Sequence, residues 1–135
     1  MTNLTNKTKL FAAVKSLKYL VRGGRVSPVK GAIARMLNLT PIISVDSEGK
    51  AVQLDKVFSH EAGIQKVLQK IRKMEVEGKI WNYVILHAYS EKKAIWFASE
   101  VEKIVNKKPV AILNISPVIG VHAGPGTIAL ALMME

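Results

Sequence analysis

Residues 81–115, WNYVILHAYSEKKAIWFASEVEKIVNKKPVAILNI, contain the pattern that decides the fold. Residues 81–87 are a short apolar run of the kind found in buried parallel strands, and residues 109–115 are a second such run. Between them, residues 90–106 carry apolar side chains at helical spacing. A strand, a helix and a strand in this order predict a right-handed parallel crossover. The stretch therefore indicates an α/β domain.

The sequence on either side adds elements to the same domain. Residues 59–76 predict a long amphipathic helix, and residues 41–45 and 51–54 predict the two strands of a β-hairpin. The closing segment 126–133 fits either a last strand or an apolar helix, and we favour the strand. A chain of 135 residues has room for one ordinary domain. We therefore expect residues 1–135 to form a single α/β domain, a small sheet with helices packed on it plus a β-hairpin.

The first forty residues predict two short basic helices. In residues 8–21, apolar side chains recur along one helical stripe, and Gly23-Gly24 supplies a helix end. Ser27-Pro28 then predicts the start of a second helix over residues 28–37. The side chains expected to face inward on these two helices are Leu10, Val14, Ile33 and Leu37.

The charge is concentrated in this first third of the chain. The chain has 20 Lys and Arg against 10 Asp and Glu, and the first 45 residues contain eight of the basic residues and no acidic one. Such a surface attracts phosphates, anionic lipid or an acidic protein partner. The helix–turn–helix-like spacing also fits a small basic nucleic-acid-binding domain, although no base-reading polar residues are interleaved with the basic ones. A solvated helix face explains the charge equally well.

Several chemistries find no support in the residues. The absence of cysteine excludes a disulfide framework, a thiolate metal site and a Cys nucleophile, and it agrees with a reducing, cytoplasmic location. His60, His87 and His122 show no metal-ligand spacing, and His87, at the end of a predicted strand, is best interpreted as a buried and hydrogen-bonded residue. No nucleophile with its base is recognisable. We therefore expect no metal and no cofactor, while an enzyme that uses His122 and Arg25 on a small anion stays an alternative.

One motif suited to an anion is SPVIGVHAGPG at residues 116–126, expected to be a long loop after a buried strand. In open α/β sheets, ligands bind outside the carboxyl ends of strands. Gly120, Gly124 and Gly126 would let backbone N–H groups approach an anion, and His122 can donate a hydrogen bond to a carboxylate or phosphate. A tight turn with one satisfied histidine explains the same residues.

The other motif is Gly23-Gly24-Arg25. Arg25 sits on a turn from which its guanidinium could reach an oxyanion, and the alternative is an exposed cation beside a helix C-terminus. An Arg and a His in one small domain with abundant apolar surface suit an amphiphile with an anionic head better than a free phosphate.

The two motifs resemble the second domain of DegV-family fatty-acid-binding proteins. In that family a helix ending in Leu-x-x-Gly-Gly-Arg-[IV] precedes another helix and Asn-x-x-Pro-Ile, as residues 20–26 and 38–42 do here. The family's closing motif is similar to PVIGVHAGPG at residues 117–126. The resemblance extends from residue 8 to the end, with two departures: Ser116 stands where the family usually has Gly, and Phe58 where many members have Arg.

The resemblance implies a fatty-acid carrier rather than an enzyme. The acyl chain would lie in an apolar tunnel within this half, and its carboxylate at the junction with the family's N-terminal domain, which has no counterpart in these residues. A separate fatty-acid kinase would be the partner, and the basic third of the chain offers a surface for it or for an anionic membrane, whereas nucleic acid is not expected. The implied head-group residues are Arg25, His122, Gly124 and Gly126, and the implied acyl-pocket residues are Leu10, Val14, Ile33 and Leu37.

Overall fold

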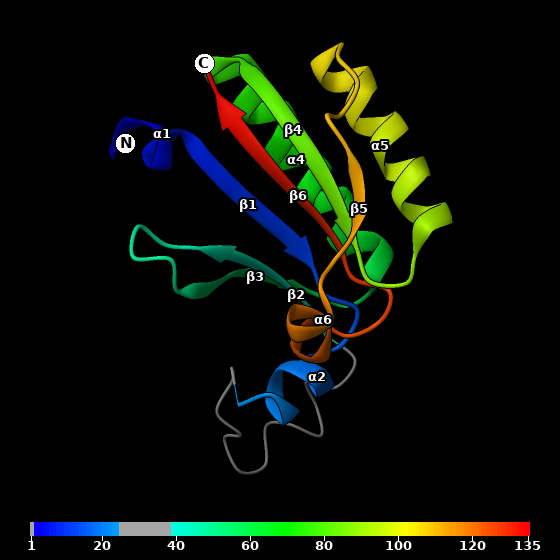
Figure 1. Ribbon diagram of the computed structural model, residues 1–135. Coiled ribbons are helices and arrows are strands. Elements are labelled where there is room, and N and C mark those ends of the chain that lie inside the picture. Colours follow the sequence, from blue (N-terminus) through cyan, green and yellow to red (C-terminus); the bar gives the residue numbers. More distant parts are fainter. Residues whose placement is uncertain (1, 25–38) are drawn as a thin grey trace.

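The computed structural model describes residues 2–24 and 39–135 and contains one six-stranded sheet in the order β3-β2-β1-β6-β4-β5 (Figure 1). The strands are β1 (Thr8–Ala13), β2 (Thr40–Val45), β3 (Ala51–Val57), β4 (Ile80–His87), β5 (Ile112–Asn114) and β6 (Ile128–Met134). The described helices are α1 (Thr2–Lys7), α2 (Leu17–Arg22), α4 (His60–Gly78), α5 (Glu91–Val105) and α6 (Pro117–Ala123). The predicted α/β fold, with helices packed on a small sheet, is confirmed.

Residues 81–115 fold in the predicted order, but the second strand differs from the prediction. Strands β4 and β5 pair in parallel with α5 between them in sequence, whereas the other strand pairs of the sheet are antiparallel. Strand β5 has only three residues, and the Leu113 side chain on it is 50% exposed. The expectation of a buried strand at residues 109–115 is therefore wrong. An edge strand has one neighbour only, so its side chains and its outer edge reach solvent.

The predicted hairpin and last strand are both confirmed. Strands β2 and β3 pair antiparallel, and the Asp46 carboxylate between them accepts hydrogen bonds of 2.9 Å from the N–H groups of Glu48 and Lys50. Strand β6 lies between β1 and β4 near the centre of the sheet. It contains seven apolar residues in a row, so it is apolar on both sides of the sheet.

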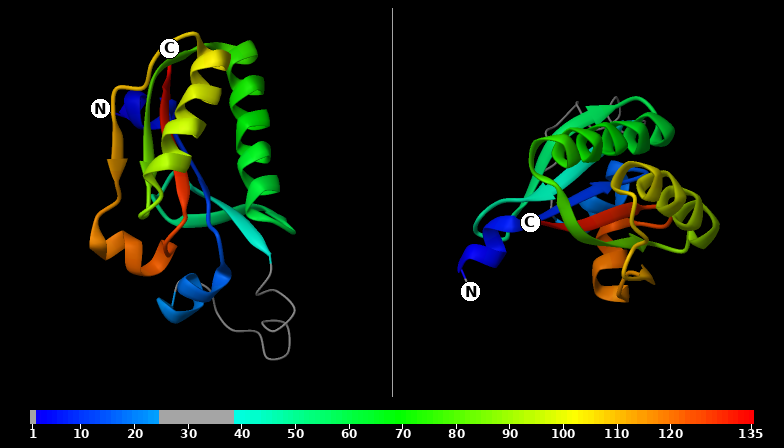
Figure 2. Two further views of the ribbon diagram at one scale, coloured as in Figure 1. Left: turned by 90° about the vertical axis from the view of Figure 1, so that its right-hand side faces the viewer. Right: turned by 90° about the horizontal axis from the view of Figure 1, so that it is seen from above.

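Helices α4 and α5 lie along the same face of the sheet (Figure 2). Helix α4 begins after Ser59, whose hydroxyl oxygen accepts a hydrogen bond of 3.1 Å from the Ala62 N–H, and its buried residues follow a helical stripe. Helix α5 ends at Asn106, which adopts the left-handed conformation with φ of 55°. The two helices and the strand side chains beneath them, including Ile85 and Leu130, form the main hydrophobic core.

The prediction of one helix over residues 8–21 is wrong. Residues 8–13 form strand β1, which pairs with both β2 and β6, and only residues 17–22 form helix α2. The apolar spacing that suggested a single helical stripe runs across both elements. Pairing with a strand on each side explains the strand, because the hydrogen bonds to β2 and β6 outweigh the local helical spacing. Ser16 caps α2 by accepting a hydrogen bond of 3.2 Å from the Lys18 N–H.

The end of α2 is where the sequence places it. The N–H of Gly23 donates to the Tyr19 carbonyl at 2.9 Å, and the N–H of Gly24 donates to the Val21 carbonyl at 3.1 Å. The predicted helix over residues 28–37, together with Arg25, Ile33 and Leu37, lies outside the described residues.

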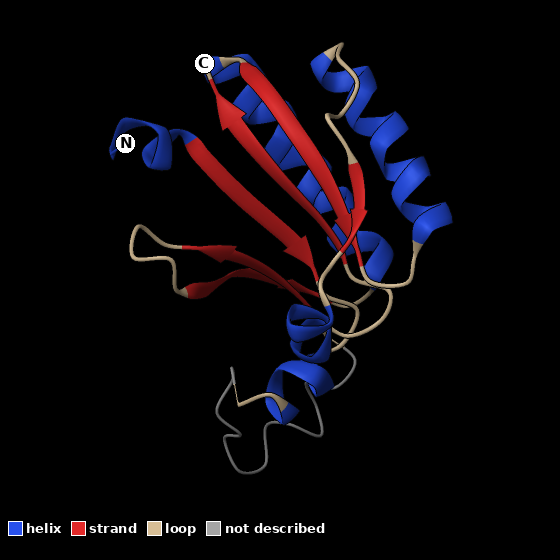
Figure 3. Ribbon diagram, in the orientation of Figure 1, coloured by secondary structure: helices blue, strands red, loops and turns tan. Residues whose placement is uncertain are grey.

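The opposite face of the sheet is also apolar, but α4 and α5 do not cover it. Strand register puts Leu10 and Ala131 side by side on this second face, next to Val84 of β4. Of the described helices, α2 and α6 lie at one end of the sheet, toward this second face (Figures 2 and 3). The side chains of the second face that surround the sheet centre are Leu10, Ala12, Ile43, Val84, Leu86, Ala129, Ala131 and Met133.

Candidate functional site

The predicted loop at residues 116–126 contains a helix. Helix α6 starts at Pro117 after Ser116, and the N–H of Gly120 donates to the Ser116 carbonyl at 2.8 Å. It ends at Gly124, whose φ of 78° ordinary L-residues rarely adopt. The expectation of a long loop is therefore wrong for residues 117–123. The signal was present in the sequence, because Ser followed by Pro is typical of a helix start, and Ser116-Pro117 has this pattern.

The two motifs that sequence analysis singled out lie against each other. Helix α2 packs on α6 (Figure 3), and a Cβ atom added at Gly23 would overlap the imidazole ring of His122. A Cβ at Gly124 would likewise overlap the ring of Tyr19. Both glycines are therefore required where the helices cross, and the Gly-Gly motif and the His-Ala-Gly-Pro-Gly motif build one structure.

Gly126 makes a third close contact of this kind. Its φ is 90°, and a Cβ there would lie 2.7 Å from Cδ of Lys15, so the aliphatic stem of that lysine lies on the glycine backbone. The predicted head-group residues His122, Gly124 and Gly126 thus come together beside α2. The fourth, Arg25, lies outside the described residues.

His122 has an unsatisfied polar atom at this junction. Its Nδ1 is buried and has no hydrogen-bond partner among the described residues. Buried polar groups in proteins are nearly always paired, so such an atom needs a partner from elsewhere. This makes the imidazole a candidate contact for a ligand or for a group outside the described residues.

The predicted acyl-pocket residues occupy two places. Val14 is buried with Leu17 and Leu20 in a small second core beneath α2, against Ala12 and Ile43 of the sheet. Leu10 is half-buried on the second face of the sheet, not on a helix. Ile33 and Leu37 lie outside the described residues.

Sequence reasoning missed most of the second face. Ala12, Val84, Leu86 and Ala131 were not expected to contribute to a site, although they share this face with Leu10. The signal was the unbroken apolar run of β6, since a strand covered on one face only alternates between apolar and polar residues.

The other two histidines have partners. His87 is 7% exposed, and its Nδ1 accepts a hydrogen bond of 3.1 Å from the Ser90 N–H, which confirms the structural interpretation of this residue. Nε2 of His60 lies 3.2 Å from the Ala13 carbonyl oxygen, which can only accept, so Nε2 donates. Burial lowers the pKa of His60, and the positive charges of Lys93 and Lys15 lower it further.

Within the described ranges, no group of three or more His, Asp or Glu residues is arranged to hold a metal ion. Nor does any helix in these ranges have the length and apolar character needed to cross a membrane. The nucleic-acid alternative loses its main support, because residues 8–13 form a strand in the sheet rather than the first helix of a helix–turn–helix.

A helix ending in Gly-Gly, packed under a His-Ala-Gly-Pro-Gly segment at one end of a six-stranded sheet, defines an α/β domain of the DegV type. The family model described as "Uncharacterised protein, DegV family" matches residues 1–135, so this chain belongs to the DegV family. The resemblance inferred from the two motifs is thereby confirmed.

Individual relatives agree with this assignment. A DegV domain-containing protein of Clostridium acetobutylicum is 36% identical over 134 residues, covering 98% of this chain and 47% of the relative. The crystal structure of a fatty acid binding DegV family protein from Streptococcus agalactiae matches with a TM-score of 0.80 and 26% identity, over 96% of this chain and 46% of that one. The fatty acid kinase B3 protein of Streptococcus pneumoniae, loaded with linoleic acid, shares the fold with a TM-score of 0.79 at 19% identity, over 99% of this chain and 47% of that one. This chain therefore spans about half the length of the proteins it matches.

Proposed function

We propose that this chain binds a long-chain fatty acid without transforming it, with the acyl chain lying along the second face of the sheet. The observation that carries the proposal is the apolar character of that face, whose centre is covered by neither α4 nor α5. The fatty-acid-binding protein of Streptococcus agalactiae, which shares the fold at 26% identity, supports the same ligand class.

The shape of the second face suits a linear chain. Small side chains run along its middle, Ala12 on β1 and Ala129 and Ala131 on β6. Larger ones flank them, among them Ile43 on β2 and Val84 on β4. Each CH₂ group that leaves water contributes about 0.8 kcal/mol, so a long acyl chain gains most from covering such a row.

The carboxylate belongs at the α2–α6 end of this face. There the Nδ1–H tautomer of His122 would donate to a carboxylate oxygen, next to the backbone of Gly124 and Gly126, on which Tyr19 and Lys15 pack. Arg25 remains part of the proposed head-group site. Because the chain spans half of its relatives, the other half would complete the site, and a fatty-acid kinase would meet the exposed carboxylate. Lys18 and Arg22 are exposed on α2 at this end and would suit an acidic kinase surface or an anionic membrane.

Native mass spectrometry of the 135-residue chain, before and after titration with oleate, tests the proposal. We expect a one-to-one complex, and we expect Ala131→Phe to abolish it, because the ring occupies the row of small side chains without entering the main core. His122→Ala should weaken the complex by about tenfold through loss of a charge-assisted hydrogen bond.

The control is Val76→Phe, which adds the same ring at an 86% exposed position on α4. That variant should bind oleate like the wild type. Retention of oleate by the Ala131→Phe protein would show that the acyl chain does not use this face, and no complex with the wild type would reject binding by this chain.

A further inference from the structure

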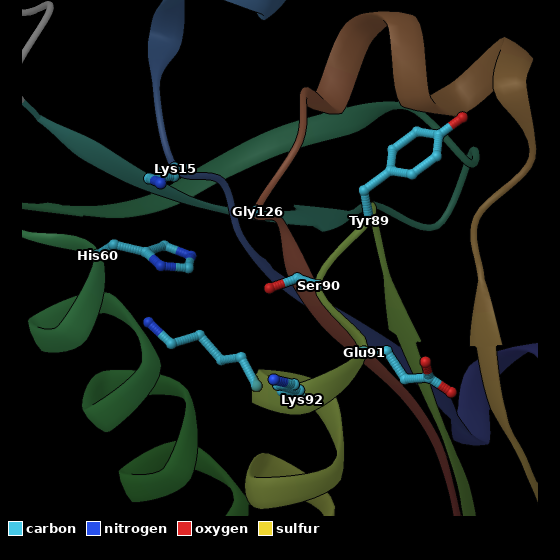
Figure 4. Close-up of a pocket in the computed structure, with 8 residues that line it drawn as sticks. Lys15, His60, Tyr89, Ser90, Glu91, Lys92 and Gly126 are labelled. Atoms are coloured by element: carbon cyan, nitrogen blue, oxygen red, sulfur yellow. The ribbon is translucent and has the colours of Figure 1, made fainter.

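A solvent-open pocket of about 370 Å³, lined by several charged residues, lies beside Gly126, which it shares with the proposed head-group site (Figure 4). Four separate segments build it: the connection after β1, the start of α4, the turn between β4 and α5 together with the first turn of α5, and the connection before β6. Its lining residues are Lys15, His60, Tyr89, Ser90, Glu91, Lys92, Lys93 and Gly126.

The charges of this cavity are unbalanced. Lys93 pairs with Glu61, but Lys15 and Lys92 have no carboxylate partner within the described part of the chain. Lys15 is held in place because its stem lies on the backbone of Gly126. Figure 4 shows the Ser90 hydroxyl directed toward the His60 ring, with Lys15 above that ring, whereas the Glu91 carboxylate and the Tyr89 ring point away. Glu91 therefore does not neutralise the positive charge of this cavity.

Ser90 adds a free hydroxyl. It occupies the N-cap position of α5 but makes no capping hydrogen bond with its side chain. Ser16 and Ser59, at the corresponding positions of α2 and α4, do cap their helices. The Ser90 hydroxyl is thus available to a ligand in the cavity.

His60 closes the opposite side. Its Nε2–H donates to the Ala13 carbonyl, which fixes the ring and leaves Nδ1 as the atom that accepts or takes up a proton. The pKa of this imidazole is lowered by burial and then by Lys93 and Lys15, as expected where positive charges converge on a partly enclosed space. Glu61 is the charged group that opposes this effect.

We propose that this cavity binds a phosphoryl group, either as free phosphate or as the monoester end of a lipid. Two unpaired ammonium groups call for a ligand with two negative charges, which a phosphate carries near neutral pH and a carboxylate does not. The tetrahedrally arranged oxygens of a phosphate suit donors that come from different segments, and this lining offers the Lys15 and Lys92 ammonium groups and the Ser90 hydroxyl. The site shares Gly126 with the proposed fatty-acid site but none of its side-chain donors, so either proposal can fail while the other stands.

The test is isothermal titration calorimetry of the 135-residue chain with inorganic phosphate at about pH 8 and constant ionic strength. We expect saturable one-to-one binding that Lys15→Met and Lys92→Met each weaken by about tenfold, the effect of losing one charge-assisted hydrogen bond. Ser90→Ala should weaken it by a smaller factor. Lys92 is exposed, so its variant remains informative even if Lys15→Met disturbs the packing at Gly126.

Lys108→Met, at an exposed lysine outside the cavity, is the matched control and should leave phosphate binding unchanged. Short-chain phosphatidic acid, titrated as monomer, separates the two sources of the group: equal affinity indicates free phosphate, and tighter binding through the same lysines indicates a lipid monoester. Absence of saturable phosphate binding overturns the proposal. An equal loss in Lys108→Met and Lys92→Met overturns it as well, because binding would then reflect the general basic surface.

Discussion

The two faces of the sheet are made by the same strands but have different neighbours. In β4, Ile85 is fully buried beneath α4 and α5, whereas the next residue, Leu86, is half-buried on the second face. The same alternation separates Leu130 from Ala131 in β6. One face is therefore a packed core, and the other is an apolar surface of similar composition without α4 or α5 over it.

This difference distinguishes apolar residues that stabilise the fold from apolar residues that are available to bind a ligand or a partner. A protein rarely leaves a continuous apolar surface without a binding role. Under the proposed function, the acyl chain contacts the second face as α4 and α5 contact the first. The comparison then predicts that substitutions on the two faces affect different measurements.

The largest effect is expected for Ile85→Ala. Removing a fully buried aliphatic side chain leaves a cavity in the main core, and we expect a loss of about 2–5 kcal/mol in the free energy of unfolding, measured by urea denaturation. The neighbouring change Leu86→Ala should cost clearly less, because its side chain is half-buried, but should weaken oleate binding. Equal losses of stability in the two variants would contradict the distinction between the faces.

Gly23→Ala tests the end of the second face, where α2 crosses α6. The added methyl group would displace the His122 ring, and overpacking of this kind costs about 1–3 kcal/mol. Displacement of the ring should also weaken oleate binding.

Gly120→Ala, in the partner helix α6, is the control. A Cβ there would have Ile115 Cγ1 at 3.9 Å as its nearest neighbour, an ordinary contact, and replacing a helical glycine by alanine stabilises by about 1 kcal/mol. We therefore expect opposite signs for the two glycines in thermal unfolding. A neutral Gly23→Ala variant would disprove the close packing of α2 on α6.

The covered face was predictable because its elements follow single, regular patterns. Helix α4 starts at a serine cap and buries one stripe, and β4, α5 and β5 follow the crossover order. The error at residues 8–21 has a physical origin. Leu10, Val14, Leu17 and Val21 lie at helical spacing, yet pairing of β1 with strands on both sides outweighs that local preference. No local pattern shows that residue 8 will lie opposite residue 133.

The candidate site was predictable in its motifs but not in its geometry. Gly23 and His122 were singled out separately, and the sequence gives no sign that the ring packs on the glycine. The cationic cavity was not foreseen at all, because Lys15, His60 and Lys92 come from three segments and share no spacing. Contacts between distant segments depend on how the whole chain folds, and the spacing of residues within one segment does not show them.

Tyr83→Phe examines a polar contact of the covered face. The Tyr83 hydroxyl donates to the Lys107 carbonyl at 2.6 Å, and burial together with Glu102 raises the pKa of Tyr83 to about 12. The variant leaves that carbonyl without its partner, so we expect a loss of about 1–2 kcal/mol in urea denaturation with no change in oleate binding. An ultraviolet titration of the wild type should show a tyrosine ionisation near pH 12, and this step should be absent from the variant. A drop in oleate affinity would show that the two faces are coupled.

The smallest effect concerns His60, at the boundary between the covered face and the cationic cavity. Its pKa is lowered in the folded chain from the ordinary value of 6.5, chiefly by burial, so the unfolded chain takes up the proton first as pH falls. The resulting contribution to stability is present above about pH 6.5 and is lost as pH drops below that value. Glu61 and Asp55, whose carboxyl pKa values are lowered by Lys93 and Lys66, titrate below their ordinary values of 4.5 and 3.8, so they do not contribute in this window.

His60→Gln keeps an N–H donor for the Ala13 carbonyl and removes the titration of the imidazole. Urea denaturation at about pH 8 and pH 5.5 should therefore show a smaller decrease in stability for the variant than for the wild type, and saturating phosphate should reduce the wild-type decrease, because a bound dianion favours protonated His60. An identical decrease in both proteins would show that the pKa of His60 is not lowered in the folded chain.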